Sequence, residues 1–155
     1  METKSEKPVR NGDGVGRGML TRLLGYHLRR AQIAVFQHFA ASMGAAAITP
    51  GQFGVLTVIN SNPGLSQTQL GNTLGIDRST VVAVIDRLES RGLVTRAVSP
   101  SDRRSHALRL SDEGARLLHR VEELVRAHER HIARDLSAED KQLLIELLDR
   151  VARRD

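Results

Sequence analysis

The 155-residue sequence predicts a mainly α-helical fold with one β-hairpin, and three observations support this class. Apolar residues recur at helical spacing through most of the chain. Residues 65–92 read as two short helices separated by a tight turn at Gly75. The next segment reads as a β-hairpin with a basic tip at residues 100–104. Together these parts form a winged helix-turn-helix, a unit that places one helix in the major groove of duplex DNA.

Residues 1–18 are expected to form a flexible tail, and residues 19–155 a single domain. Residues 11–18 alternate glycine with other residues, show no apolar periodicity and do not match the spacing of a phosphate-binding loop. A long helix is then predicted over residues 19–43. Its apolar residues fall at i, i+4, i+7, i+11 and i+15, and they are Leu24, Leu28, Ala31, Val35 and Phe39.

Capping signals mark the helices of the central unit. Residues 49–52 (TPGQ) and 66–69 (SQTQ) are capping boxes, the first with proline at the first helical position. Turn residues at 60–64 end the first of these helices, Asp77 can cap a third, and Gly92 can stop it. The apolar residues expected to face inward are Phe53, Leu56, Ile59, Leu70, Leu74, Val81, Ile85 and Leu88.

Two strands are predicted at residues 93–97 and 106–110, followed by two more helices that begin at Ser111 and Ser137. The last helix carries an aliphatic stripe that suggests a partner helix, most economically from a second copy in a two-fold homodimer. The DNA-binding unit is therefore expected at about residues 49–110, with dimerisation helices at about 19–44 and 111–153. The stripe consists of Leu143, Leu147, Leu148 and Val151, and the same helix also bears Leu144.

The charge distribution favours a nucleic-acid partner. Residues 77–110 hold seven arginines against four acids, so this segment carries +3 of the formal net charge of +5. Only Lys4, Lys7 and Lys141 are lysines, and the planar fork of arginine suits phosphates and guanine edges. A pI near 10.6 favours polyanions in general, including anionic membrane surfaces.

Several function classes find no support. No apolar run approaches the length of a membrane span, and the N-terminus lacks a secretory signal, so a cytoplasmic protein without a membrane partner is expected. The absence of cysteine excludes disulfides, thiol redox chemistry and Cys-ligated zinc. His128 and His131 share a helix face, and His27 and His38 lie on another helix, but two imidazoles rarely complete a metal shell. We expect no metal, no cofactor and no catalysis, since no nucleophile motif is present.

Three segments resemble the MarR family of bacterial transcriptional regulators: residues 77–94 (DRSTVVAVIDRLESRGLV), 101–105 (SDRRS) and 108–111 (LRLS). A helix-turn-helix pattern alone is a weak signal, but Asp-Arg-Arg at the right distance in a hairpin makes it a strong one. The resemblance covers roughly residues 20–151. It implies a triangular homodimer with interleaved first and last helices, and one winged helix per lobe on a palindromic operator in double-stranded DNA.

Carried over residue by residue, the resemblance makes residues 77–92 the recognition helix. Many family members have polar or basic residues where this chain has Val82 and Ala83, so base readout here is expected to use hydroxyls and contacts with thymine methyls. Alternatively, Asp86 and Glu89 could pair the arginines of this helix. The implied DNA-contacting residues are Ser66, Gln67 and Thr68 at a helix start, Arg78, Ser79, Thr80 and Arg87 on the recognition helix, and Arg103 at the wing tip, with Asp102 and Arg104 bracing the hairpin.

Family members commonly hold a small anionic or aromatic ligand between the dimerisation helices and the DNA-binding lobe. Residues 24–31 are similar to those of regulators that answer aromatic acids or their acyl-CoA esters, and exposed arginines would suit the CoA phosphates. The alternative is that the histidines only border the apolar stripe and Phe53 belongs to the core. The residues that could contact an effector are Arg22, Tyr26, His27, Arg29, Arg30, His38 and Phe53.

The sequence therefore predicts a sequence-specific DNA-binding regulator, a repressor that a small ligand releases. The alternative is an architectural protein that binds DNA without sequence choice and without an effector. The long helices outside the DNA-binding unit favour the regulator.

Overall fold

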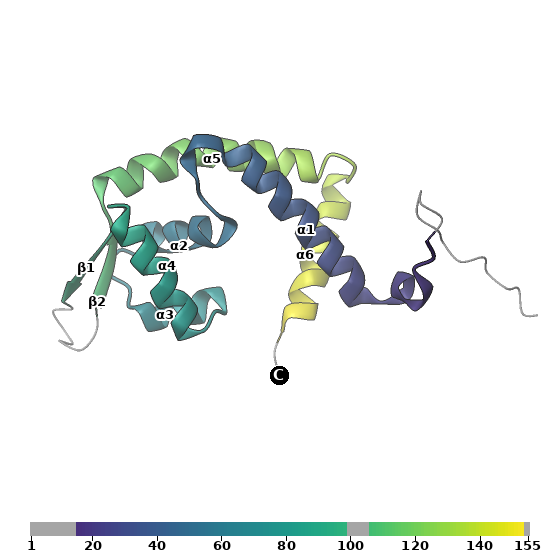
Figure 1. Cartoon of the computed structure of the whole chain (residues 1–155), viewed down its shortest axis with the longest axis horizontal. Coiled ribbons are helices and arrows are strands. Elements are labelled where there is room, and N and C mark those ends of the chain that lie inside the picture. The colour runs from purple at the N-terminus through teal and green to yellow at the C-terminus, as the bar shows by residue number, and fades with distance from the viewer. Residues whose placement is uncertain (1–14, 99–105, 154–155) are drawn as a thin grey trace, which may run out of the picture. The chain divides into compact units, whose positions relative to one another are not determined.

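The computed structural model describes residues 15–98 and 106–153 (Figure 1). It is mainly α-helical with one two-stranded antiparallel sheet, which confirms the predicted fold class. The chain forms two compact units, Met1–Gln37 and His38–Asp155. The elements are η1 (Gly18–Arg22), α1 (Leu24–Met43), η2 (Gly44–Ala46), α2 (Pro50–Ser61), α3 (Gln67–Leu74), α4 (Arg78–Ser90), β1 (Val94–Val98), β2 (His106–Leu110), α5 (Asp112–Ile132) and α6 (Ala138–Ala152).

The first predicted helix is wrong at its start. The prediction began at Met19, but η1 is a short 3₁₀ helix and Leu23 is extended, with φ −95° and ψ 121°. The extended Leu23 separates η1 from α1, and Arg17, the residue before η1, makes no side-chain capping bond. The α-helical part therefore begins at Leu24.

The helix starts that capping signals predicted are confirmed. Thr49 and Ser66 both form complete capping boxes, in which the side chain and the backbone of each residue bond to the glutamine three residues later. Asp77, Ser111 and Ser137 accept the backbone N–H of the residue at the same spacing. These side chains satisfy N–H groups that the helices leave unpaired, and so fix where each helix begins.

The turn between α3 and α4 depends on glycine. Gly75 adopts a left-handed conformation, with φ 65°, and Ile76 donates its N–H to the carbonyl of Gly71 at 3.0 Å. A Cβ on Gly71 would lie 3.0 Å from the Ile76 carbonyl oxygen and 3.2 Å from a methyl of Val81. The two helices therefore pack closely, and Figure 1 shows them side by side next to the hairpin.

The hairpin pairs antiparallel, from Val94 opposite Leu110 to Val98 opposite His106. The predicted first strand was displaced by one residue, since Leu93 is buried in the turn before β1. The loop after α2 pairs with the second strand, because Gly64 donates to the carbonyl of Leu108 at 2.7 Å and Leu108 donates to that of Leu65 at 2.9 Å. This pairing holds the hairpin against the helix-turn-helix.

One core joins the last residues of α1 to α2, α3, α4, the hairpin and the first half of α5. The start of α5 is pressed against the turn that follows α4. Ser111 donates its hydroxyl to the carbonyl of Gly92 at 2.5 Å, and a Cβ on Gly114 would lie only 2.0 Å from the carbonyl oxygen of Leu93. The most deeply buried side chains are Val55, Leu56, Ile59, Leu70, Val81, Ile85, Leu88, Val94, Leu108 and Val121.

The last helix has a different environment. None of the residues of α6 is buried, although the helix carries six large aliphatic side chains. These side chains form the α6 apolar face, which consists of Leu143, Leu144, Ile145, Leu147, Leu148 and Val151, each between 39% and 53% exposed. Among the described residues no single helix is both long and apolar enough to cross a membrane. The bent pair of residues 24–46 and 50–61 qualifies by length and composition only.

Candidate nucleic-acid interface

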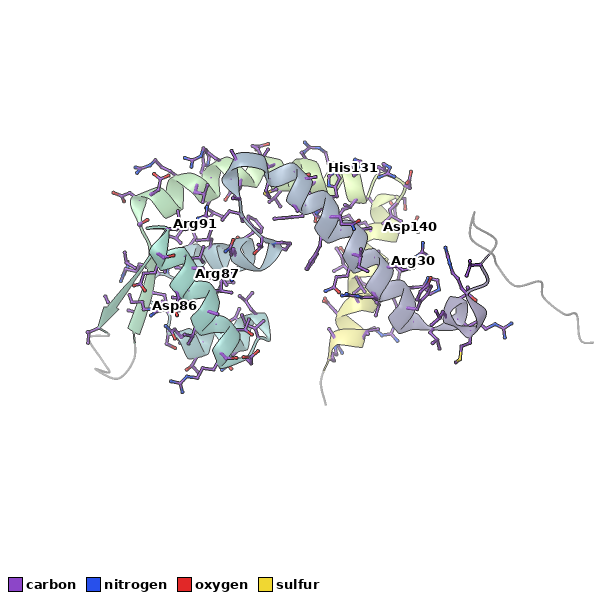
Figure 2. The ribbon with its side chains drawn as sticks, in the orientation of Figure 1. Arg30, Asp86, Arg87, Arg91, His131 and Asp140 are labelled. Carbon is purple, nitrogen blue, oxygen red and sulfur yellow. The ribbon has the colours of Figure 1, made fainter. Side chains whose placement is uncertain are left out.

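Helix α4 has one buried side and one exposed side. Val81, Ile85 and Leu88 point into the core, which leaves the polar residues at the start of the helix and Arg87 exposed. Figure 2 shows Asp86 and Arg87 on α4, and Arg91 just beyond its end. The helix can therefore present its first turn to another molecule without disturbing the core.

A cavity of about 600 Å³ lies between the start of α3, α4 and β1. It brings together four of the residues that the sequence predicted to contact DNA, namely Ser66, Gln67, Thr68 and Arg78. The first N–H groups of a helix lack partners within it, so this end of α3 suits an anionic oxygen, and Arg78 adds a cation opposite. The remaining lining residues are Gly71, Asn72, Ile76, Val81, Val82 and Arg96.

The first turn of α4 holds a closed set of hydrogen bonds around the Asp77 carboxylate. Ser79 donates its hydroxyl to one carboxylate oxygen at 2.5 Å, and Thr80 donates its hydroxyl to the other at 2.7 Å. The backbone N–H of Thr80 also donates, at 3.0 Å. The Ser79 hydroxyl, followed by the hydroxyl and N–H of Thr80, holds the pKa of Asp77 far below its usual range. Asp77 is therefore an anion throughout the physiological pH range.

Arg96 is a site residue that the sequence analysis missed. Asp86 and Glu89 were offered as partners for the arginines of α4, but the structure pairs both with Arg96 of β1. The Arg96 guanidinium hydrogen-bonds to Asp86 and lies 3.6 Å from Glu89. Alternation along the strand contains the signal, because Arg96 is two residues from the buried Val94 and so points to the same side, toward α4.

The Arg96 pairs have two consequences for the interface. They pair a cation that lines the cavity with two acids of α4, and they fasten the first strand of the wing to this helix. The Nε of Arg96 is buried and has no hydrogen-bond partner within the described residues. Arg91 is engaged elsewhere, since its guanidinium donates to the carbonyls of Ala46 and Ala47 at 3.0 and 2.9 Å.

The wing tip lies outside the described residues. The contacts predicted for Asp102, Arg103 and Arg104 therefore stay predictions.

The predicted effector residues fall in both compact units. In the unit of residues 1–37, the Arg30 guanidinium lies 5.7 Å from the ring centre of Tyr26, and His27 Nε2 bonds to the carbonyl of Thr21 at 2.9 Å. Arg29 donates to Gln32 at 3.3 Å, and Arg22 is the last residue of η1. In the other unit, the ring of Phe53 packs against that of Phe39 with centres 6.4 Å apart. The role of these residues in effector binding remains a prediction.

His38 belongs to a cluster of three imidazoles, which we call the histidine cluster: His38, His128 and His131. The Nδ1 atoms of His38 and His128 are 2.7 Å apart, and the rings of His38 and His131 stack with centres 3.9 Å apart. His128 is only 2% exposed, so it does not lie on a solvated face of α5. Figure 2 labels His131 near the end of α5.

Burial and the neighbouring His38 lower the pKa of His128, and the same two causes, followed by Arg134, lower the pKa of His131. The parallel rings of His38 and His131 direct their nitrogen lone pairs along parallel planes, so they do not converge on one point. Among residues 15–98 and 106–153, no group of three or more histidines and acids could hold a metal ion.

A helix-turn-helix with a basic hairpin and a cavity lined by a helix start and arginines defines a winged-helix DNA-binding protein. The chain belongs to the MarR family: the model of that family matches residues 48–105, and close relatives match over nearly the whole chain.

A putative transcriptional regulatory protein for the hcr operon of Thauera aromatica is 41% identical over 139 residues, which cover 89% of this chain and 84% of that protein. The transcriptional repressor CouR bound to a 23-mer DNA duplex is 44% identical, with a TM-score of 0.84 over 90% of this chain and 99% of the other. The PcaV regulator of Streptomyces coelicolor, in complex with its natural ligand, is 33% identical, with a TM-score of 0.81 over 86% and 94% of the two chains.

Proposed function

We propose that this protein is a transcriptional repressor that binds a palindromic operator as a homodimer and is released by a small aromatic acid or its acyl-CoA ester. The observation that carries the proposal is the gathering of Ser66, Gln67, Thr68 and Arg78 around one cavity beside the exposed first turn of α4. That arrangement offers phosphate contacts next to a helix that can enter the major groove.

The DNA contacts divide into positioning and reading. The start of α3, Arg78 and Arg87 are suited to phosphates, because backbone N–H groups and guanidinium groups donate to anionic oxygens. Ser79 and Thr80, with Val82 and Ala83 of the same helix, are suited to base edges and thymine methyls. The wing residues Asp102, Arg103 and Arg104 complete the proposed interface.

The homodimer is supported by the α6 apolar face. Six aliphatic side chains between 39% and 53% exposed would lose contact with water against a second copy of the same helix. Two-fold pairing also gives two recognition helices, which matches a palindromic operator with two half-sites.

The effector class is supported by two relatives. A structure of CouR, 39% identical to this chain, is bound to p-coumaroyl-CoA, and PcaV was solved with its natural ligand. We propose that the effector contacts some of Arg22, Tyr26, His27, Arg29, Arg30, His38 and Phe53. Arginines would pair with a carboxylate or with the CoA phosphates, and the rings would contact the aromatic group.

The relatives are regulators, and we propose that this chain likewise acts on DNA in the cytoplasm and is not an enzyme. An architectural protein without sequence choice is the second candidate. The long helices outside the DNA-binding unit, α1, α5 and α6, favour the first candidate, since DNA binding without an effector does not require them.

Selection from a random duplex library tests the proposal. The enriched duplex should bind at least about 1,000-fold more tightly than its scrambled version at physiological salt. Equal affinity for the two duplexes would favour the architectural protein. Arg78→Ala should weaken binding to both duplexes and lower the salt slope by about one unit, because one phosphate contact is lost.

Arg126→Ala is the matched control, since it removes the same charge from α5, where Arg126 pairs with Glu122 and Glu123. It should leave affinity and salt slope unchanged. Addition of p-coumaroyl-CoA should release the enriched duplex, and free CoA serves as the ligand control. An enriched duplex that no aromatic acid or aromatic acyl-CoA releases would contradict the proposed effector class.

A further inference from the structure

The hydrogen bonds around Asp77 constrain how the first turn of α4 can contact DNA. A serine or threonine hydroxyl has one proton to donate and two lone pairs that accept. The proton of Ser79 goes to one oxygen of Asp77, at 2.5 Å, and that of Thr80 goes to the other, at 2.7 Å. Both exposed hydroxyls have therefore used their only donor, and what remains to each is the capacity to accept.

Asp77 keeps these protons in place. It is ionised, so it only accepts hydrogen bonds, and it is the cap of α4 through the N–H of Thr80 at 3.0 Å. If either hydroxyl turned outward to donate, a carboxylate close to the phosphates of DNA would lose one of its donors. An anion that loses hydrogen bonds in such a place is destabilised more than a neutral group would be.

We infer that Ser79 and Thr80 read DNA as hydrogen-bond acceptors, and so select bases that present an amino group in the major groove. The groups they can accept from are N6 of adenine and N4 of cytosine. They do not suit N7 or O6 of guanine, O4 of thymine or phosphate oxygens, all of which only accept. An unconstrained hydroxyl could rotate either to donate or to accept a hydrogen bond. Asp77 therefore restricts Ser79 and Thr80 to accepting hydrogen bonds from DNA.

This inference rests on the proposed function, because it requires α4 to enter the major groove. It also assigns Asp77 a role beyond capping. Asp77 is assigned no DNA contact in this account, since three of its about four acceptor positions are taken by the hydroxyls and the N–H of the same turn. It is a positioning residue that sets the direction of the hydrogen bonds its neighbours can form.

Replacement of single atoms in the enriched duplex tests the inference. Each adenine is replaced in turn by purine, which lacks the N6 amino group, and each cytosine by 2-pyrimidinone, which lacks the N4 amino group. In parallel, guanine O6 is removed with 2-aminopurine and guanine N7 with 7-deazaguanine. Affinities of wild type, Ser79→Ala and Thr80→Val are measured for every duplex, and circular dichroism confirms that the variants fold.

We expect at least one position in each half-site where loss of an amino group weakens wild-type binding by about tenfold. At that position the same replacement should have no effect on the variant that lacks the matching hydroxyl. The inference would be overturned if loss of a hydroxyl cancelled the effect of removing guanine O6 or N7. It would also be overturned if loss of a hydroxyl cancelled the effect of no replacement at all. Failure of the proposed function is seen separately, as equal affinity of wild type for the unmodified enriched and scrambled duplexes.

The variant Asp77→Asn distinguishes a positioning role of Asp77 from a role in capping α4 alone. An amide still accepts the Thr80 N–H, but its own NH₂ can donate to a hydroxyl and free that proton for DNA. The variant should therefore tolerate acceptor bases at the amino-selective positions, with a preference reduced about tenfold. A uniform loss of affinity with the preference unchanged would show that Asp77 only caps the helix, and would overturn its positioning role.

Discussion

Helices α4 and α6 both carry aliphatic side chains at helical spacing, but those side chains end in opposite environments. Val81, Ile85 and Leu88 of α4 are at most 1% exposed, whereas the α6 apolar face is exposed along its whole length. The winged helix thus completes its own core within one chain. The packing of α4 is therefore explained by the single chain, whereas the single chain leaves the α6 apolar face partly exposed, and we propose that a second copy covers it.

The largest effect is expected at Gly114, where the winged-helix core leaves no space for a larger side chain. Gly114→Ala places a Cβ 2.0 Å from the carbonyl oxygen of Leu93, and neither backbone can move without breaking the bonds of Ser111. The free energy of unfolding should fall by about 3 kcal/mol, measured by urea denaturation. Gly51→Ala is the control, because its Cβ would meet open space in a helix and should be neutral or slightly stabilising. Similar stability of the two variants would contradict the described packing.

The second prediction tests the α6 side of the comparison. Leu143→Asp combined with Leu147→Asp puts two charges on the α6 apolar face and should weaken dimerisation by about 100-fold or more, because each side chain loses its buried partner surface. Sedimentation velocity over a range of concentrations measures this. Glu146→Gln, on the same helix, should leave the dimer intact. A double variant that sediments as wild type does would place the interface elsewhere.

The third prediction concerns the histidine cluster, which combines burial with titratable groups. Folding lowers the pKa of His128 below its ordinary value of 6.5. The folded protein therefore binds this proton more weakly than the unfolded chain does. The contribution of His128 to stability is therefore complete above about pH 6.5 and is lost as the pH falls below that value, by no more than about 1.4 kcal/mol per pH unit. Urea denaturation between pH 5 and 8 should show this loss in wild type.

The slope should flatten in His128→Leu and persist in His119→Leu, which removes an exposed histidine from the same helix. Other charged groups also shift the pKa values of the cluster: Glu129 raises that of His128, Asp135 raises that of His131, and Arg134 lowers that of His131. Glu129 in turn lies 3.4 Å from Lys141 of α6. Equal slopes in all three proteins would remove His128 as the cause.

The smallest effect is expected for the partly exposed ion pairs between β1 and α4. Arg96→Met removes a cation that lines the cavity and takes the partner of Asp86 and Glu89 away, and it should weaken duplex binding by about threefold with little change in stability. Asp86→Asn with Glu89→Gln in the Arg96→Met background should restore affinity, since the repulsive charges are gone. Fluorescence anisotropy with the enriched duplex measures both. No recovery would mean that Arg96 acts through packing of the wing rather than through charge.

The sequence predicted the features that depend on residues close together in the chain. The starts of α2 to α6 follow from side chains that bond three residues along the chain, and the residues of the α4 core follow from helical periodicity. The fold class follows from these local patterns and is confirmed. Membership in the MarR family was predicted from a resemblance of three segments and is also confirmed.

Contacts between distant segments could not be predicted in this way. His38 meets His128 across ninety residues, and no spacing rule relates them. Arg96 was missed because its partners lie on another element, where the docking of strand on helix decides the pairing. The same limit applies to the start of α1, where the apolar pattern continued but the backbone did not stay α-helical.

The mass of the complex with the enriched duplex, measured by native mass spectrometry, tests the central claim most directly. The claim is that each chain supplies one complete winged helix and that α6 joins two of them into the unit that binds an operator. We predict two chains on each duplex, with no complex of one chain at any ratio of protein to DNA. A stable complex of one chain with the palindromic duplex would contradict it.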